Sequence, residues 1–230
     1  MSEQAYSAGA ISPRRIPGPP DRRSPTAALG IAALCAIGLA LVWIAAELTP
    51  AGQARDSILL NHFVLLNRPR VDVLANALLG VLAPAPFICF GLILVAIAIV
   101  RGRPRVALAV ALVLSLAPLT AETLKPLLAH PHVQIGGIYI APASWPSGHS
   151  TAALALVLCA VLVAPVRLRP LVLGLGIAFA AAVGCSLLIL AWHMPSDVVG
   201  GYLVASLWMA LAVAGLRASD RRSPPMARVS

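Results

Sequence analysis

Uninterrupted apolar stretches alternate with short polar segments along most of this 230-residue chain. The first stretch, residues 26–46, contains no charged residue, and five more follow at 73–100, 106–121, 151–166, 171–192 and 198–216. A helix needs about 20 apolar residues to cross the hydrocarbon core of a bilayer, where an isolated strand cannot satisfy its backbone. The pattern therefore predicts an all-α, integral membrane bundle of six helices.

Two of these stretches depart from the usual length. Residues 106–121 are slightly short for a span, so the helix is expected to extend towards Lys125. Residues 73–100 are long and contain Pro84 and Pro86, which favour a kink in the helix. The first stretch is too long for the apolar core of a typical signal peptide, which indicates a retained membrane helix.

Composition supports a membrane protein with short polar ends. Mean hydropathy is +0.90, and only 11% of residues are charged, against about 25% in soluble domains. Residues 1–25 are rich in proline and arginine and are predicted to be a disordered basic tail. Residues 26–216 form the predicted membrane domain, and residues 217–230 a second basic tail.

The basic residues predict how the bundle is oriented. The net charge is +9, but the arginines form short clusters between apolar stretches, which does not favour binding to nucleic acid. If six helices alternate, 13 of the 17 basic residues fall on the side of both termini; the other four are Arg55, Arg68, Arg70 and Lys125. The positive-inside rule then places both termini in the cytoplasm and the first, third and fifth loops outside.

Most of the remaining ionisable residues fall in those outer loops. The segment HMPSD carries His193 and Asp197, and Pro195 disfavours a helical conformation at Met194. We therefore expect a turn that leads into the last helix, with Asp197 near its first residue. A carboxylate placed there can hold the imidazole in one tautomer and stabilise its cationic form.

A second polar segment, PSGH, precedes the fourth apolar stretch. Gly148 allows the backbone to approach a ligand closely, and Ser147 with the first N–H groups of the helix provides an anion cradle. Lys125 adds a point charge suited to phosphate. With His149 and His193 nearby, the set suits a reaction in which one histidine is the nucleophile and another is the acid.

These segments resemble the motifs of the type-2 phosphatidic acid phosphatase (PAP2) superfamily. The PSGH motif is complete, and the motif that follows it along the chain matches at Ser186, His193 and Asp197. The first motif is partial: Lys125 is present, but His132 stands where the family has an arginine. The resemblance covers about residues 50–215.

The resemblance implies a role for each matching residue. His193 corresponds to the nucleophile that forms a phosphohistidine, Asp197 to its orienting partner, and His149 to the general acid. The phosphate ligands would be Lys125, Ser147 and Gly148. The family needs no metal, so no cofactor is expected.

Both phosphate-clamping arginines of the family are missing, because position 132 is His and position 187 is Leu. Three explanations follow. The bound phosphate protonates His130 or His132, the outer residues Arg68 or Arg70 supply the charge, or the protein binds lipid phosphate weakly without catalysis. Histidine does not replace a bidentate arginine conservatively.

The sequence thus predicts a lipid phosphatase of the plasma (inner) membrane with its site on the extracytoplasmic face. Its substrate would be a polyprenyl phosphate or pyrophosphate, phosphatidic acid or phosphatidylglycerol phosphate. The alternatives are a lipid phosphotransferase and a non-catalytic carrier of lipid phosphate. A further alternative is a metal-dependent enzyme that uses the histidines of the segment HPH, although Lys125 would repel a cation. The four cysteines show no metal-binding or disulfide spacing.

Overall fold

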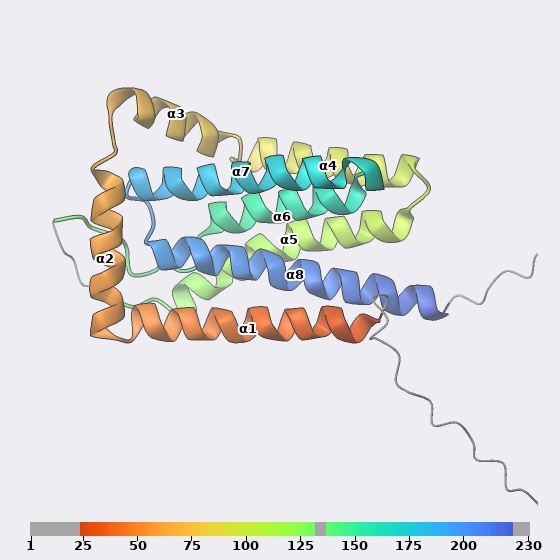
Figure 1. Ribbon diagram of the computed structural model, residues 1–230, viewed down its shortest axis with the longest axis horizontal. Helices are drawn as coiled ribbons and strands as arrows, with labels where there is room; N and C mark the ends of the chain where they lie inside the picture. The colour runs from red at the N-terminus through yellow and green to blue at the C-terminus, as the bar shows by residue number, and fades with distance from the viewer. Residues whose placement is uncertain (1–23, 132–136, 223–230) are drawn as a thin grey trace, which may run out of the picture.

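The computed structural model describes residues 24–131 and 137–222, and this part of the chain is helical without strands. Most of the helices lie alongside one another, α2 crosses one end of the bundle, and the two described chain ends lie at the other end (Figure 1). The helices are α1 (Pro25–Glu47), α2 (Pro50–Val64), α3 (Pro69–Gly80), α4 (Pro84–Val100), α5 (Pro104–Leu127), α6 (Gly148–Val163), α7 (Arg169–Ile189) and α8 (Pro195–Arg222), with a 3₁₀ turn, η1 (Val166–Leu168), before α7. The all-α prediction is confirmed.

Proline begins most of the described helices. Proline suits the first turn because its missing N–H would have no partner there and its φ is already helical. Ser24 and Thr49 cap two of these helices by accepting hydrogen bonds from Thr26 N and Gly52 N. The helices that begin at a proline start at Pro25, Pro50, Pro69, Pro84, Pro104 and Pro195.

Four described helical stretches are long and apolar enough to cross a membrane: α1, α5, α8 and Val166–Ile189, which contains α7. The pair α3 and α4 would be a fifth, bent by 50°. At 16 residues, α6 spans only about 24 Å, less than the ~30 Å hydrocarbon core. Because α6 packs against α4, α5, α7 and α8, protein rather than lipid covers much of its surface. Six complete crossings remain a prediction.

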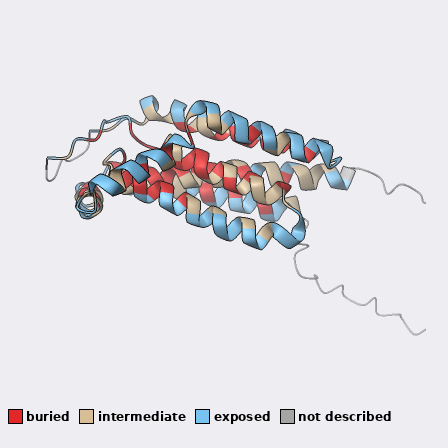
Figure 2. Ribbon diagram, turned by 90° about the horizontal axis from the view of Figure 1, so that it is seen from above, coloured by how far each residue is buried: buried red, intermediate tan, exposed pale blue. Residues whose placement is uncertain are grey.

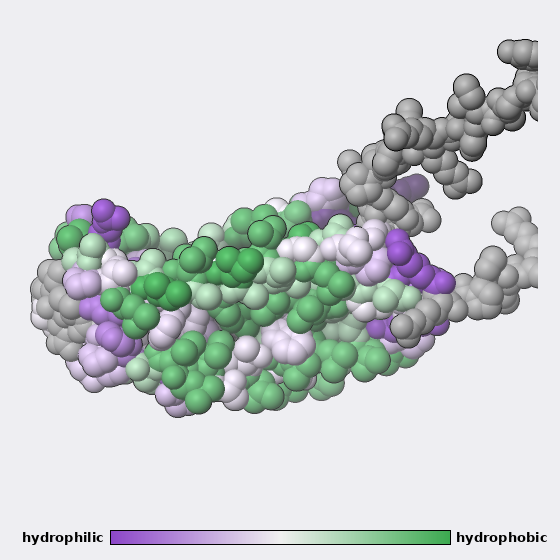
Figure 3. All heavy atoms as spheres, turned by 90° about the horizontal axis from the view of Figure 1, so that it is seen from below, coloured by the Kyte–Doolittle hydropathy of each residue, from purple (hydrophilic) through white to green (hydrophobic). Residues whose placement is uncertain are grey.

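The surface of the bundle is that of a multi-pass membrane protein. Apolar side chains cover the middle of the face in Figure 3, and hydrophilic residues gather towards its two ends. Leu34, Ile88 and Leu175 are among the large apolar side chains that are exposed on the bundle. Buried residues are concentrated along the interior of the bundle (Figure 2), so the exposed apolar side chains are available to lipid.

The structure changes the prediction for the first outer loop. Residues 50–64 form helix α2, which the sequence did not indicate because Arg55 and Asp56 interrupt its apolar pattern. The kink predicted at Pro84 is confirmed as a break between α3 and α4. The predicted extension of the third stretch is also confirmed, and Lys125 therefore lies in the last turn of α5 rather than in a loop.

Arginines gather at the end of the bundle that holds the described termini. Arg101 and Arg103 donate to the carbonyls of Leu162 and Val163, at the C-terminus of α6. The negative end of the helix dipole stabilises cations at that position. Arg217 reaches across to the carbonyl of Ser24, because α8 continues to Arg222, beyond the predicted apolar stretch.

Candidate active site

The connection between α7 and α8 places His193 at the end of the bundle that α2 crosses. Ala191 adopts a left-handed conformation, with φ 54°, and closes α7: its N–H bonds Leu188 O, and Trp192 N bonds Leu187 O at 2.9 Å. This is a Schellman motif, in which the residue at the left-handed position is usually glycine. The motif turns the chain sharply, so that His193 follows directly after the helix.

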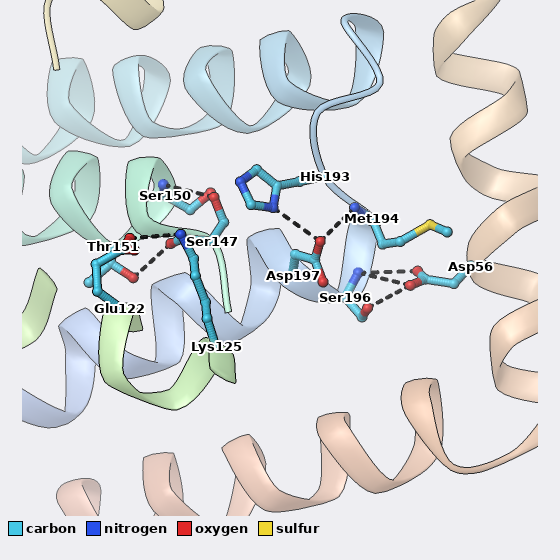
Figure 4. A network of polar contacts seen from close by, with 10 residues as sticks. All are labelled: Asp56, Glu122, Lys125, Ser147, Ser150, Thr151, His193, Met194, Ser196 and Asp197. Atoms are coloured by element: carbon cyan, nitrogen blue, oxygen red, sulfur yellow. Dashed lines mark hydrogen bonds and ion pairs between the residues drawn. The ribbon is translucent and has the colours of Figure 1, made fainter. Parts of the chain in front are cut away.

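His193 faces a buried carboxylate. Its Nδ1 lies 3.1 Å from Asp197 Oδ2, and the same oxygen accepts the Met194 N–H at 2.8 Å (Figure 4). Asp197 is fully buried, and His193 is 9% exposed. His193 lies in a turn before α8, as the proline predicted. With Nδ1–H donated to Asp197, the lone pair of the imidazole is on Nε2.

The PSGH segment is tied to α8. Ser147 N donates to Asp197 O at 2.9 Å, and Thr151 Oγ1 donates to both Ser147 O and Gly201 O. A methyl group on Gly201 would lie 2.5 Å from Ser147 O, so the two helices meet backbone to backbone. Ser147 is fully buried, and its Oγ accepts Ser150 N at 3.4 Å, which caps α6.

Two side chains of α5 lie over the first residue of α6. A methyl group on Gly148 would lie 2.5 Å from Glu122 Oε1 and 3.6 Å from Lys125 Nζ. Lys125 Nζ and Glu122 Oε1 are paired at 2.7 Å. The N-terminus of a helix favours an anion, and the Glu122 carboxylate occupies that position.

His149 lies in the first turn of α6, between these groups. Its ring meets Trp192 edge to face, with ring centroids 5.8 Å apart. It lies close enough to His193, Lys125 and Glu122 to interact with their charges. The structure therefore brings together one lysine, two histidines and one aspartate from the ends of α5, α6 and α8.

The site lies within the part of the chain that matches a known protein family. The profile described as the PAP2 superfamily matches residues 105–221, just over half of the chain. The matched range holds every residue of the site described above. The chain belongs to the PAP2 superfamily. The resemblance inferred from the motifs is thus confirmed.

A solved structure has the same fold. The crystal structure of a transmembrane PAP2 type phosphatidylglycerolphosphate phosphatase from Bacillus subtilis matches with a TM-score of 0.58 and 20% sequence identity. The alignment covers 90% of this chain and 99% of the other. No curated protein sequence matches this PAP2 chain.

The position of one missing family arginine is buried in this PAP2 protein. Leu187 is fully buried and belongs to an apolar cluster with Leu60, Met194 and Val198. An arginine would have to bury its charge there, behind the His193 turn, at a high desolvation cost. The side chain of the preceding Ser186 donates to Ala182 O within α7, and among the described residues no hydrogen bond joins it to the site.

The outer arginines do not contact the site within the described residues. Arg68 donates from Nη1 to Leu65 O and Asn67 O, at the junction between α2 and α3. Arg70 lies in the first turn of α3. Neither is among the groups that interact with the charge of His149. The structure thus gives no contact through which Arg68 or Arg70 would replace a family arginine.

The histidines of the segment HPH are placed only in part. His130 Nδ1 lies 3.4 Å from Gln53 Nε2, on α2, and its backbone N–H donates to Pro142 O. His132 lies outside the described residues. Among the residues that the structure describes, no group of three or more His, Cys, Asp or Glu side chains is arranged to hold a metal ion.

Two carboxylates at the site were not predicted from the motifs. Glu122 precedes Lys125 by three residues, a helical spacing that favours an ion pair but does not give its position over Gly148. Asp56, on α2, accepts hydrogen bonds from Ser196, next to Asp197. No local pattern signals that contact, because 140 residues separate the partners.

Proposed function

We propose that this PAP2 membrane phosphatase removes a terminal phosphate from a lipid through a phosphohistidine on His193. The observation that carries the proposal is the His193–Asp197 pair beside the N-terminus of α6. Because Asp197 occupies Nδ1, the Nε2 lone pair is the one available to attack phosphorus. Asp197 also stabilises the positive charge that the imidazole acquires when it is phosphorylated.

In the first step, Nε2 of His193 bonds to phosphorus while the bond from phosphorus to the leaving oxygen breaks. His149 donates a proton to that oxygen, which leaves as an alcohol, or as phosphate if the substrate is a pyrophosphate. In the second step, water gives its proton to His149 and attacks phosphorus. The P–N bond breaks, and inorganic phosphate and free His193 are restored. No metal ion takes part in this scheme.

The phosphate oxygens would bind at the N-terminus of α6. Lys125 Nζ and the first N–H groups of α6 supply positive potential there. Gly148 leaves room for the oxygens because it lacks a side chain. Phosphate binding requires that Glu122 give up its position over Gly148, so that Lys125 exchanges one anion for another.

Replacing Glu122 with glutamine should therefore tighten substrate binding. The amide keeps the size of the side chain but removes the negative charge that competes with phosphate. We expect KM to fall by about 2- to 5-fold, the range of an exposed ion pair, with little change in kcat. Steady-state kinetics of the parent and Glu122→Gln measure this. A higher KM would instead show that Glu122 holds Lys125 in its working position.

The same scheme leads to a proposal for the membrane face and the substrate. The arginines lie mainly at the opposite end from the site, so the positive-inside rule favours an extracytoplasmic site in the plasma (inner) membrane. A site at the end of a membrane bundle suits a lipid whose headgroup meets the helix ends. The substrates we favour are phosphatidylglycerol phosphate, phosphatidic acid and a polyprenyl phosphate or pyrophosphate.

Phosphate release by the purified protein from each of these lipids tests the function. We expect turnover of at least one lipid, and turnover should persist in the presence of a chelator. Activity that a chelator abolishes and zinc restores would contradict the metal-free scheme. Lipid phosphate that binds but is never hydrolysed would favour the carrier alternative. Transfer of the phosphate to an added alcohol would identify a phosphotransferase.

A further inference from the structure

A hydrogen-bonded contact joins α2 to the start of α8. Asp56 Oδ2 accepts Ser196 Oγ–H at 2.5 Å, and Ser196 N donates to Oδ1 at 3.1 Å and to Oδ2 at 3.4 Å (Figure 4). Both the side chain and the backbone of Ser196 are therefore held by one carboxylate. Ser196 is itself buried, at 7% exposed.

The backbone partner is a group that α8 cannot satisfy by itself. The first N–H groups of a helix have no partner within it, and Pro195, the first residue of α8, has no N–H. Ser196 N is thus the first free donor of α8, and Asp56 supplies its acceptor from another helix. The positive end of the helix dipole also stabilises a carboxylate at this position.

Ser196 lies directly before Asp197, the residue that holds His193. We propose that Asp56 is a positioning residue: it fixes the first turn of α8 and thereby keeps Asp197 in register with His193. Asp56 acts through Ser196, since its side chain bonds Ser196 and no hydrogen bond or ion pair joins it to His193 among the described residues. This inference rests on the proposed function, because it gives α2 a part in the same reaction.

Charge argues that the contact is specific. The pKa of Asp56 is raised to about 6, mainly by burial. The hydrogen bonds from Ser196 act against this rise, and the charge of Asp197 adds to it. The carboxylate of Glu47, at the end of α1, also interacts with the charges of Asp56 and Asp197. Asp56 is thus charged at neutral pH among other acids, and charge-assisted bonds from Ser196 offset that cost.

The position of α2 gives the contact a rigid base. α2 packs against α1, α7 and α8, and Gln53 Nε2, one turn before Asp56, donates to Glu47 O. Leu60, one turn after Asp56, is buried in the apolar cluster that includes Met194. The helix is therefore anchored on both sides of Asp56.

The test compares Asp56→Ala, Ser196→Ala, the double variant and Asp56→Asn with the parent. Asp72→Ala is the control, because Asp72 is a helical aspartate of α3 that, among the described residues, has no hydrogen bond or ion pair to the site. Hydrogen exchange of the segment 193–198, followed by mass spectrometry, reports the contact without any need for turnover. The turnover rate divided by the number of sites that bind vanadate gives kcat, which reports the effect of the contact on the reaction.

We expect Asp56→Ala to speed exchange in 193–198 and to lower kcat by about 10-fold or more, as for a displaced catalytic group, with little change in KM. The double variant should lose no more than Asp56→Ala alone, and Asp56→Asn should recover part of kcat, since its amide oxygen can still accept Ser196 N–H. Asp72→Ala should resemble the parent.

Two outcomes would overturn the inference. Unchanged exchange in Asp56→Ala would show that the contact does not hold the start of α8. Faster exchange with unchanged kcat would show that the contact is structural only. If the parent hydrolyses no lipid phosphate, the proposed function is overturned, and with it the role of Asp56 in the reaction. Hydrogen exchange of the segment 193–198 would then still show whether the contact between Asp56 and Ser196 holds the start of α8.

Discussion

His193→Ala is expected to abolish phosphate release, with a loss on the order of 10⁴-fold or more in kcat. The variant lacks the nitrogen that would carry the phosphoryl group. Among the described residues, no other nucleophilic side chain is hydrogen-bonded to the Asp197 carboxylate. Initial rates with the best lipid substrate, together with a brief reaction with labelled substrate and trapping of the protein, measure the effect. The parent should carry label that is lost in acid, as expected for a phosphohistidine, and the variant should carry none.

His62→Ala is a matched control for this result. His62 is exposed on α2, so its removal changes the number of histidines without touching the site. It should keep the parental rate and labelling. Phosphate release that survives in His193→Ala would reject His193 as the nucleophile, and label that persists in this variant would assign the covalent step to another residue.

The second large effect is expected for His149→Ala, with kcat on a lipid phosphate lowered by about 10²- to 10⁴-fold, as for loss of a general acid. His149 lies beside Trp192 and close to the charge of His193, where a leaving oxygen would emerge. The effect should depend on the leaving group. An aryl phosphate, whose phenolate is a weak base, needs little protonation and should lose much less.

In His149→Ala, the ratio of the rate with the lipid phosphate to the rate with the aryl phosphate separates loss of acid catalysis from damage to the fold. A misfolded site would lose both substrates equally, which would contradict the assignment of His149 as the acid. A normal yield of phosphohistidine with an aryl phosphate, followed by slow hydrolysis, would further support His149 as the base in the second step. His62→Ala again serves as the control.

The segments of the site could be predicted from sequence because their chemistry is local. PSGH forms the start of a helix with its own serine cap, and Pro195 begins α8, so that His193 lies in the turn before it. In both cases a few adjacent residues fix the backbone, so the geometry follows from residue type and spacing. The roles assigned to these residues remain predictions until the variants are measured.

Other features depended on contacts between distant residues. In the sequence, Leu187 stands where the family has an arginine. In the fold, it belongs to a core cluster that includes Leu60 and Met194. Helix α2 was missed because its charged residues interrupt the apolar pattern. One of those residues, Asp56, finds its partner on α8. No window of sequence contains both halves of such a contact.

By itself, the sequence determined that the chain lies in a membrane and that its apolar stretches are helices, and it predicted that three polar segments carry the chemistry. Hydrophobicity, proline and glycine act over a few residues, so they can be read along the chain. Only the tertiary structure decided that Glu122 lies over Gly148 and that Asp56 holds the start of α8. These positions follow from how the helices pack, and packing depends on side chains far apart in the sequence.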